Sequence, residues 1–596
     1  MVMLTIMFIR SIKIPSSNGT VHEYIRIVSS VREQGKVKQK VVANLGRRDT
    51  LEAVLPMLNR FLQGEGDVAS LLTEQGVIEP LDASTWGPSL VVRHFFKQLG
   101  LWKLLDAGRR WPHLRSEEDP ADDWVSRVLV LITNRLTRPA SEHALAHWLE
   151  TDYACDRSGR RYVAHWKQQQ RVQVDLAQLQ RWYRTLDHLL VNKDEIEVAL
   201  FQRLRTLFDF QAELVFYDIT STYFEGHGPS FAKHGYSRDG KPRNVQIVVG
   251  VVMIAGWPIA HHIWAGNTRD STTVPEVIAD LEKRFGLVRI VFVGDRGMVT
   301  KENLQLFPAG EGAGFLFGMT RRRNPEAETL IDRIDESQWI ECAVGINARE
   351  KKKPPRTRVQ EVQCDRAGVR VFVVDSDERR AHEERQRTKV MNRAREALQR
   401  VRARVEKGRL KQPAKIGAAV ERALQKHHGY RYYAWELTDG KLEITEHPVN
   451  LPREKKYEGK YLIQTDQVDM TPQDAVAHYK ELSEVERGFH SLKDPLGMRP
   501  IWHHADRRVK AHIFVAALSF LMERMLERAL QDSQVNLSAQ SAIESLKTIR
   551  YVQFQVDGEP RSGVTPGNAR ARQVLKALHL TKIRPPTPPQ GQETRM

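Results

Sequence analysis

Cysteine is scarce in this sequence, and the few thiols lie far apart. The 596 residues contain only Cys155, Cys342 and Cys364, with no close paired spacing. This distribution argues against a disulfide framework, and it argues equally against a zinc site built from cysteine pairs. We therefore expect a cytoplasmic protein.

Long hydrophobic runs are also missing. The apolar run Ala511–Met522 lies between Lys510 and Glu523 and is shorter than the roughly 20 residues that span a bilayer. It is typical of a buried helix. Met1–Ile9 is apolar but has no basic region before it and no small-residue cleavage site after it, which favours a first strand over a secretory signal. The sequence predicts no membrane association.

The amino-acid composition is that of a globular protein, with a large excess of positive charge. Hydrophobic residues make up 41% and charged residues 28% of the chain, which is long enough for several domains. The net charge of +17 and a sequence pI near 9.6 favour a polyanionic partner. With a membrane disfavoured, we expect that partner to be nucleic acid.

The N-terminal third combines a basic hairpin with a helical region. Residues 21–45 alternate around Glu33-Gln34-Gly35, which predicts two paired strands. From about 84 to 208 the apolar residues recur at helical spacing, which predicts a helical region that could bind DNA. Its tryptophans could stack on bases, but at helical spacing burial is favoured. They are Trp86, Trp102, Trp124, Trp148, Trp166 and Trp182.

From Glu213 onward the pattern becomes that of an α/β domain. Leu214–Tyr217 and Val288–Val293 are continuous apolar runs, as expected for buried strands, and they end at Asp218 and Asp295. Further strands are predicted over 245–254 and 258–264, and a helix over 274–285. Strands alternating with helices predict a mixed sheet covered by helices.

The segment from 321 to 455 differs in character. It contains a predicted strand at 369–374 and a long basic helix over 378–410 with a narrow apolar seam, as in a helical hairpin. Further strands are predicted at 430–437 and 460–464. The tail from Arg584, rich in Pro, Gln and Thr, is predicted to be disordered.

A predicted helix ending at Lys493 carries charges on its apolar side. Thr471 is its expected N-cap, with Pro472 in the first turn. Because position i+7 returns to within about 20° of position i, Tyr479, Glu486 and Lys493 line up, and the pattern places them within the apolar stripe. A structural alternative is that Glu486 pairs with His490 one turn on, while Lys493 extends to solvent at the helix end.

Asp218, Asp295 and Glu486 are the candidate metal ligands. A single aspartate after a strand is usually a turn former. Two of them on neighbouring strands, with a glutamate on a helix facing the sheet, instead predict a site of oxygen ligands suited to Mg²⁺ or Mn²⁺. Two such ions about 4 Å apart serve phosphodiester displacement. In a basic chain, this predicts cleavage of DNA or RNA.

These residues resemble a known family. Tyr479, Glu486 and Lys493 are similar to the Tyr-x2-Arg-x3-Glu-x6-Lys helix of DDE transposases from one group of bacterial insertion sequences. Asp218 in Tyr-Asp-Ile-Thr-Ser and Asp295 in Gly-Asp-Arg-Gly-Met resemble that group's two catalytic aspartates. The resemblance implies a ribonuclease H-like α/β core interrupted by an insertion domain.

This sequence departs from the family pattern at one position. The arginine that the pattern places three residues after the tyrosine is Leu482 here, so another side chain would have to make its phosphate contact. Arg487 and Lys480 are the candidates. The three acidic positions do not depend on it.

The resemblance implies a DNA transposase that cleaves transposon ends and transfers the 3′-hydroxyl into target DNA. Asp218, Asp295 and Glu486 would be catalytic and would bind two Mg²⁺ ions, for which Mn²⁺ could substitute. Tyr479, Lys493 and Arg487 would contact DNA phosphates. The DNA partners would be terminal inverted repeats and target DNA, bound by a homodimer in the nucleoid of a bacterial cytoplasm.

The sequence is also compatible with two other functions. One is a ribonuclease H-like nuclease without strand transfer, and the other is a non-catalytic DNA-binding repressor derived from a transposase. Some relatives flip a base against an insertion-domain tryptophan, and Trp435 and Trp339 are candidates, although a core role is favoured for both.

The predicted organisation has six parts. They are an N-terminal β-rich region (1–80), a helical and DNA-binding region (81–208), the first half of the catalytic core (209–320), an insertion domain (321–455), the second half of the core (456–530), and C-terminal helices with a disordered tail (531–596).

Overall fold

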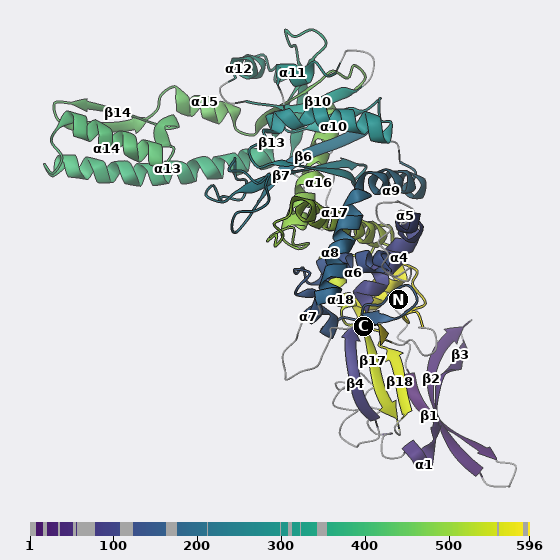
Figure 1. Cartoon of the computed structure of the whole chain (residues 1–596). Helices are drawn as coiled ribbons and strands as arrows, with labels where there is room; N and C mark the ends of the chain where they lie inside the picture. The colour runs from purple at the N-terminus through teal and green to yellow at the C-terminus, as the bar shows by residue number, and fades with distance from the viewer. Residues whose placement is uncertain are drawn as a thin grey trace.

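The structure is a computed structural model of the chain (Figure 1). It describes residues 7–15, 21–33, 36–51, 55, 78–107, 123–162, 176–210, 213–298, 300–307, 313–321, 324–342, 355–556, 559–587 and 594–595.

The N-terminal residues form a small antiparallel sheet at one end of the molecule (Figure 1). Its strands are β1 (Met7–Pro15), β2 (Val21–Glu33) and β3 (Lys36–Arg47), and α1 (Arg48–Leu51) follows. The predicted hairpin is therefore confirmed. The predicted first strand is described from Met7 onward and pairs with β2 from Met7 to Pro15, while residues 1–6 lie outside the described residues.

A helical layer follows and contains the tryptophans. Its elements are β4 (Ile78–Thr85), α4 (Gly87–Gln98), α5 (Leu101–Ala107), α6 (Trp124–Thr137), α7 (Leu145–Thr151), β5 (Arg161–Tyr162), α8 (Leu176–Val191) and α9 (Lys193–Phe208). The four tryptophans Trp86, Trp124, Trp148 and Trp182 are buried, and Trp102 packs against the same core. The core role is confirmed for these five, while Trp166 lies outside the described residues.

A nine-stranded mixed sheet forms the centre of the molecule, in the order β11-β12-β13-β16-β10-β9-β6-β7-β8. Its strands are β6 (Leu214–Tyr223), β7 (Gln246–Ile254), β8 (Trp257–Ala265), β9 (Val291–Gly294), β10 (Gly314–Met319), β11 (Ile340–Glu341), β12 (Thr357–Val362), β13 (Arg370–Ser376) and β16 (Lys460–Thr465). β6, β7 and β8 pair antiparallel, whereas β9 runs parallel to β6 and β10 parallel to β9. The predicted mixed sheet is confirmed.

Both faces of this sheet are buried, as β7 shows. All nine of its residues are buried, and successive side chains enter opposite cores because strand side chains alternate. Val248 and Val252 belong to the core shared with the helical layer, whereas Val249 and Val251 belong to a second core under α16. The sheet therefore separates two layers of helices.

The covering helices are α10 (Asp270–Phe285), α11 (Lys301–Leu304), α12 (Pro325–Asp332), α16 (Pro472–Lys493) and α17 (Asp506–Asp532). The helix α16 begins as predicted, because the side chain of its N-cap Thr471 accepts a hydrogen bond from the Asp474 amide. The predicted buried run Ala511–Met522 lies inside α17. Among the helices of the described residues, none is long and apolar enough to cross a membrane.

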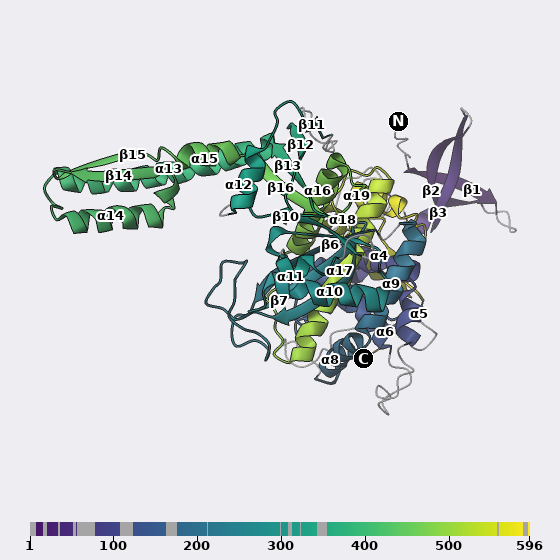
Figure 2. The ribbon, with the colours of Figure 1, turned by 90° about the horizontal axis from the view of Figure 1, so that it is seen from above.

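An arm projects from the sheet between β13 and β16 (Figures 1 and 2). It consists of α13 (Asp377–Glu406), α14 (Pro413–Lys426), the hairpin β14 (Tyr433–Thr438) and β15 (Lys441–Glu446), and α15 (Asn450–Tyr457). Ala394, Leu398 and Val401 of the predicted seam are buried against α14 in the arm's own core, so the predicted helical hairpin is confirmed. Within the segment 321–455, the strands β11 to β13 extend the central sheet instead of joining the arm.

The C-terminal part of the chain packs beside the N-terminal part. Their elements are α18 (Ala539–Leu546), β17 (Arg550–Val556), β18 (Glu559–Val564), α19 (Ala569–Ala577) and β19 (Thr594–Arg595). The strand β17 pairs with both β18 and β4, so chain segments far apart in sequence share one sheet. The predicted disorder from Arg584 is wrong for β19, which pairs in parallel with β5, and 588–593 lie outside the described residues.

Candidate active site

Asp218 and Asp295 lie side by side on adjacent parallel strands. The register pairs Leu214 with Val291 and Phe216 with Val293. Continuing it by two residues places Asp218 opposite Asp295, which directly follows β9. The predicted position of Asp218 at the end of its strand is wrong, because β6 continues to Tyr223 through its pairing with β7.

The two aspartates face the helix α16. Side chains two residues apart on a strand share a face, so Asp218 points to the side of Phe216, and Asp295 to the side of Val293. Phe216 and Val293 both belong to the core that contains Val485 of α16. Glu486 is the next residue on that helix, and α16 packs on both strands.

The charges of the three carboxylates act on one another. Burial raises the pKa of Asp218 to about 7, and the negative charges of Asp295 and Glu486 add to this shift. The hydrogen bond that the Ile219 amide donates to Asp218 Oδ1 at 2.8 Å works in the opposite direction. Partial desolvation, and next the charge of Asp295, raise the pKa of Glu486, although this residue remains exposed to solvent. The structure therefore brings together the three predicted acidic residues.

No compensating cation lies at ion-pair distance from these carboxylates within the described part of the chain. An oxygen-only, uncompensated set is the kind of ligand set that Mg²⁺ and Mn²⁺ prefer, so the residues present fit such an ion. Their oxygens are not all within 4.8 Å of one another.

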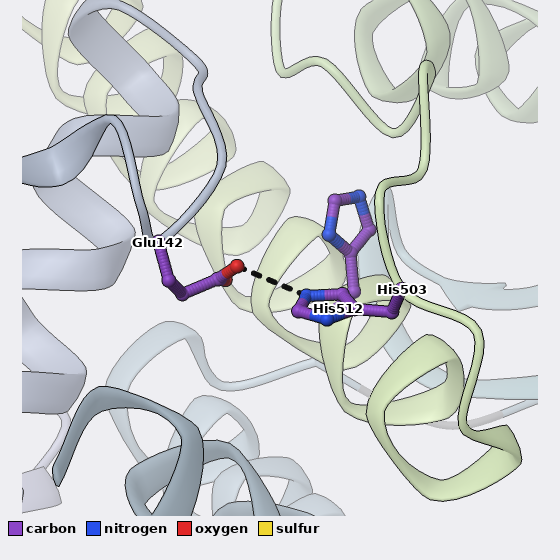
Figure 3. A group of neighbouring side chains, drawn as sticks. All are labelled: Glu142, His503 and His512. Atoms are coloured by element: carbon purple, nitrogen blue, oxygen red, sulfur yellow. Dashed lines mark ion pairs between the residues drawn. The ribbon is translucent and has the colours of Figure 1, made fainter. Parts of the chain in front are cut away.

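A second cluster contains ligand-type atoms that do lie within 4.8 Å of one another. It consists of Glu142, His503 and His512, all buried (Figure 3). Glu142 Oε2 lies 3.0 Å from His503 Nε2, and Arg135 Nη2 lies 3.3 Å from His512 Nδ1. Because the guanidinium already brings a positive charge to this cluster, a metal cation there would be repelled.

The pKa values of this second cluster indicate that its charges compensate one another. Burial alone would raise the pKa of Glu142, but the hydrogen bond and charge of His503 and the charge of Arg135 hold it below its usual value. Burial, with the Arg135 charge, lowers the pKa of His512 well below its usual value. We read the cluster as an ion-pair network that joins the helical layer to α17.

The remaining predicted residues of α16 lie in different surroundings. Glu486 is exposed at the edge of the helix, so its predicted position within the apolar stripe is wrong. Tyr479 is half-buried, stacks on Tyr461, and packs so closely on β10 that a side chain at Gly318 would collide with its hydroxyl. Burial, and next the charge of Asp295, raise the pKa of this hydroxyl, which therefore lies near the acidic site.

Lys493 is buried and paired. Its Nζ lies 2.8 Å from Asp239 Oδ1, so the structural alternative of a solvent-directed lysine is wrong. Arg487 is exposed and pairs with Glu484 on the same helix. Leu482 is buried in the core under α16, and its aliphatic side chain cannot bind a phosphate.

Sequence reasoning missed three residues near the site, Arg238, Asp239 and Arg499. Arg499 Nη1 lies 2.9 Å from the same Asp239 oxygen that binds Lys493. Arg238 donates to Asp270 at 2.6 Å, and its charge lowers the pKa of Asp218. The only local signal was Asp239-Gly240, which marks a turn but does not say what the turn contacts.

The two candidate tryptophans have local partners. Trp435 Nε1 donates to Glu421 at 3.0 Å and packs against the arm's core. Trp339 donates to Glu336 at 3.1 Å, and the Arg358 guanidinium lies 4.4 Å from the centre of its ring. Both contacts favour the structural role that the sequence suggests.

Comparison with known proteins adds two family matches. Residues 210–522 match the family model described as transposase DDE domain. Residues 9–72 match the one described as IS1634 family transposase, N-terminal domain. No curated protein matches the chain.

A solved structure titled "Cryo-EM structure of piggyBac transposase synaptic complex with hairpin DNA" is 9% identical to this chain. The match covers 79% of this chain and 82% of that one, with a TM-score of 0.33. A similarity this low carries no weight beside the family matches.

Proposed function

The chain belongs to the transposase DDE domain family, and from this premise we propose which of its residues carry out each part of the reaction. It is an enzyme of DNA transposition that cleaves DNA and transfers strands. The single observation that supports the residue assignment is the convergence of Asp218, Asp295 and Glu486 on one side of the sheet, where the charge of Asp295 raises the pKa values of both Asp218 and Glu486.

Asp218, Asp295 and Glu486 are the proposed ligands of two Mg²⁺ ions, for which Mn²⁺ can substitute. These ions would supply the Lewis acidity for phosphodiester displacement. The protein's own part is to hold Asp218 and Asp295 at a fixed spacing by the β6–β9 pairing, and to present Glu486 from the rigid helix α16. Fixed ligands need no reorganisation when the reaction occurs.

The core is proposed to be ribonuclease H-like. The strand order β8-β7-β6-β9-β10 supports this, since three antiparallel strands come first in sequence and two parallel strands then add beside the first. The arm and the sheet extension β11 to β13 are proposed to form the insertion domain. The other predicted domain boundaries keep the ranges given from the sequence.

The DNA contacts are assigned by charge and position. Lys493 and Tyr479 lie on the same helix as Glu486 and are proposed to hold phosphates near the scissile bond. Arg487 is exposed beside Glu486 and is a proposed contact for a more distant phosphate. The DNA is proposed to be the terminal repeats of an insertion sequence and its target, bound by a homodimer on paired ends in the bacterial cytoplasm.

A cleavage assay tests the assignment. Asp218→Asn, Asp295→Asn and Glu486→Gln should each abolish Mg²⁺-dependent cleavage of DNA carrying the flanking regions of the gene. The matched control is Glu484→Gln, which removes the same charge from the same helix at a residue that pairs with Arg487. Cleavage retained in any one of the three variants would remove that residue from the site.

Strand transfer separates the proposed function from its alternatives. A pre-cleaved end with a free 3′-hydroxyl should join to plasmid DNA in the presence of Mg²⁺. A nuclease of the same fold would cleave without joining. A repressor would bind the ends normally and would do neither, even with all three carboxylates intact.

A further inference from the structure

The loop between β6 and β7 contains a tight turn that lies against the candidate active site. The Gly240 amide donates to the Ser237 carbonyl, and Gly240 has a φ of 67°, which glycine adopts without strain. This turn presents Arg238 and Asp239, two adjacent residues of opposite charge, in different directions.

Three contacts fix the turn between the acidic residues and the end of α16. The Arg238 amide donates to Ser221 Oγ at 3.0 Å, on the same strand as Asp218. The Arg238 guanidinium donates to both carboxylate oxygens of Asp270, at 2.6 and 2.7 Å. On the other side, Asp239 Oδ1 lies 2.8 Å from Lys493 Nζ. The turn therefore lies beside the acidic residues and against the C-terminal end of α16.

Asp239 pairs with two cations that could otherwise bind a DNA phosphate. Its Oδ1 also lies 2.9 Å from Arg499 Nη1, while the other side of that guanidinium lies 2.8 Å from Asp494. Lys493 and Arg499 thus carry two positive charges against two carboxylates, and the group has no net charge. A phosphodiester, with one negative charge, gains little electrostatic attraction from this arrangement.

The pairing of Asp239 is incomplete. Its side chain is only 8% exposed, yet Oδ2 is buried without a hydrogen-bond partner among the described residues. A buried unpaired oxygen raises the free energy of the closed turn. An anion that bound Lys493 and Arg499 and released Asp239 to water would remove that penalty.

We propose that Asp239 occupies the place of a DNA phosphate on Lys493 and Arg499, and that DNA binding displaces it together with the turn Ser237–Gly240. Arg499 is then a second phosphate ligand beside Lys493, in a chain whose Leu482 cannot make a phosphate contact. Asp239 is a positioning residue that keeps both cations in place and blocks them until DNA arrives. The proposal rests on the proposed function.

DNA binding by Asp239→Asn tests the proposal. The probe is a fluorescein-labelled duplex of arbitrary sequence, followed by anisotropy with the full-length protein in Ca²⁺. The variant should bind roughly fivefold more tightly than wild type, because a competing negative charge is gone. Asp494→Asn is the matched control, since Asp494 also pairs with Arg499 but is 54% exposed and does not touch Lys493. It should change binding by less than about twofold.

A combined variant separates displacement from general charge effects. Adding Arg499→Gln to Asp239→Asn should remove most of the gain, because the cation freed by the first change is lost by the second. A gain that survives in the double variant, or an equal gain in Asp494→Asn, would overturn the proposal. Wild-type protein that fails to bind the duplex at all would instead count against the proposed function.

A second single variant keeps the test valid if Asp239→Asn does not fold. Asp270→Asn weakens the anchor of Arg238 and leaves Asp239, Lys493 and Arg499 unchanged. The turn should then open more readily, and DNA affinity should rise in the same direction, by about two- to threefold. Unchanged affinity in a folded Asp270→Asn protein would also overturn the proposal.

Discussion

Two clusters of titratable side chains in this molecule differ in burial and carry opposite charge balances. Glu142, His503 and His512 are all buried, whereas Asp295 and Glu486 are exposed. Beneath the helical layer, Glu142 meets His503 and the charge of Arg135, and its pKa is held below the usual value despite burial. Its negative charge is compensated. Because protein groups already compensate the charges of this network, it needs no bound ligand to be stable.

In the acidic cluster at the central sheet, the negative charges are not compensated. Burial and the charges of Asp295 and Glu486 together raise the pKa of Asp218 to about 7. The repulsion among these carboxylates raises the free energy of the folded chain. Uncompensated negative charge, and not the presence of a carboxylate alone, therefore distinguishes the proposed functional site from the structural one.

The largest expected difference between the clusters is in activity. Asp218→Asn should lower Mg²⁺-dependent DNA cleavage by about a thousandfold or more, since one of the three proposed metal ligands is lost. In metal-free buffer the same variant should be at least as stable as wild type, because it removes a repelled charge. Cleavage rate and the denaturation midpoint are the two measurements. Greatly reduced stability with inactivity would mean that Asp218 is structural.

The next largest effect concerns the compensated cluster. Glu142→Gln removes the buried carboxylate that pairs with His503 and whose charge acts on Arg135, and it should lower the free energy of unfolding by about 3 to 5 kcal/mol. Chemical denaturation measures this loss, and metal-dependent cleavage per folded molecule should be unchanged. If Zn²⁺ restored stability to wild-type protein treated with chelator, the cluster would be a metal site after all.

The pH dependence of stability should differ between the two clusters. Between about pH 4 and pH 7 the unfolded chain ionises Asp218 while the folded chain keeps it protonated, so the folded state binds more protons. The unfolding free energy of metal-free protein should therefore fall as the pH rises through this window, and then level off. Asp218→Asn should lack this component, and bound Mg²⁺ should suppress it in wild type. An identical pH profile for the variant would contradict the raised pKa.

The smallest expected effect is at Arg487. Its ion pair with Glu484 is exposed, so Arg487→Gln should change stability by less than about 0.5 kcal/mol. DNA affinity should fall by no more than about twofold to threefold, as for one peripheral phosphate contact. Anisotropy with the same duplex measures this. A loss of tenfold or more would move Arg487 into the centre of the DNA interface.

The sequence predicted much of the core because the signals there are local. Two apolar runs on either side of Ala255-Gly256-Trp257 identified β7 and β8, and the cap at Thr471 with apolar steps identified α16. The acidic residues followed from the resemblance and from their place after apolar runs. The end of β6 was missed because Thr220, Ser221 and Thr222 resemble a turn by composition, whereas pairing with β7 keeps them in the strand.

The features that escaped prediction depend on distant contacts. Nothing near Asp239 indicates that Lys493, more than two hundred residues later, will be its partner. Likewise, β11 to β13 read as part of an insertion, and only the pairing of β13 with β16 makes them part of the central sheet. Long-range pairing is set by the whole fold, so local patterns do not encode it.

The pairing of β4 with β17 has a consequence for protein synthesis. The ribosome makes β4 early, but its partner strand emerges only after the whole core and the arm have been translated. Until then Trp86 lacks the Ile549 carbonyl that accepts a hydrogen bond from its amide, and Gly87 lacks the backbone of Leu546 against which it packs. The helical layer of a nascent chain therefore lacks these contacts until residues 546–556 have been made, and it exposes the apolar surface that they cover.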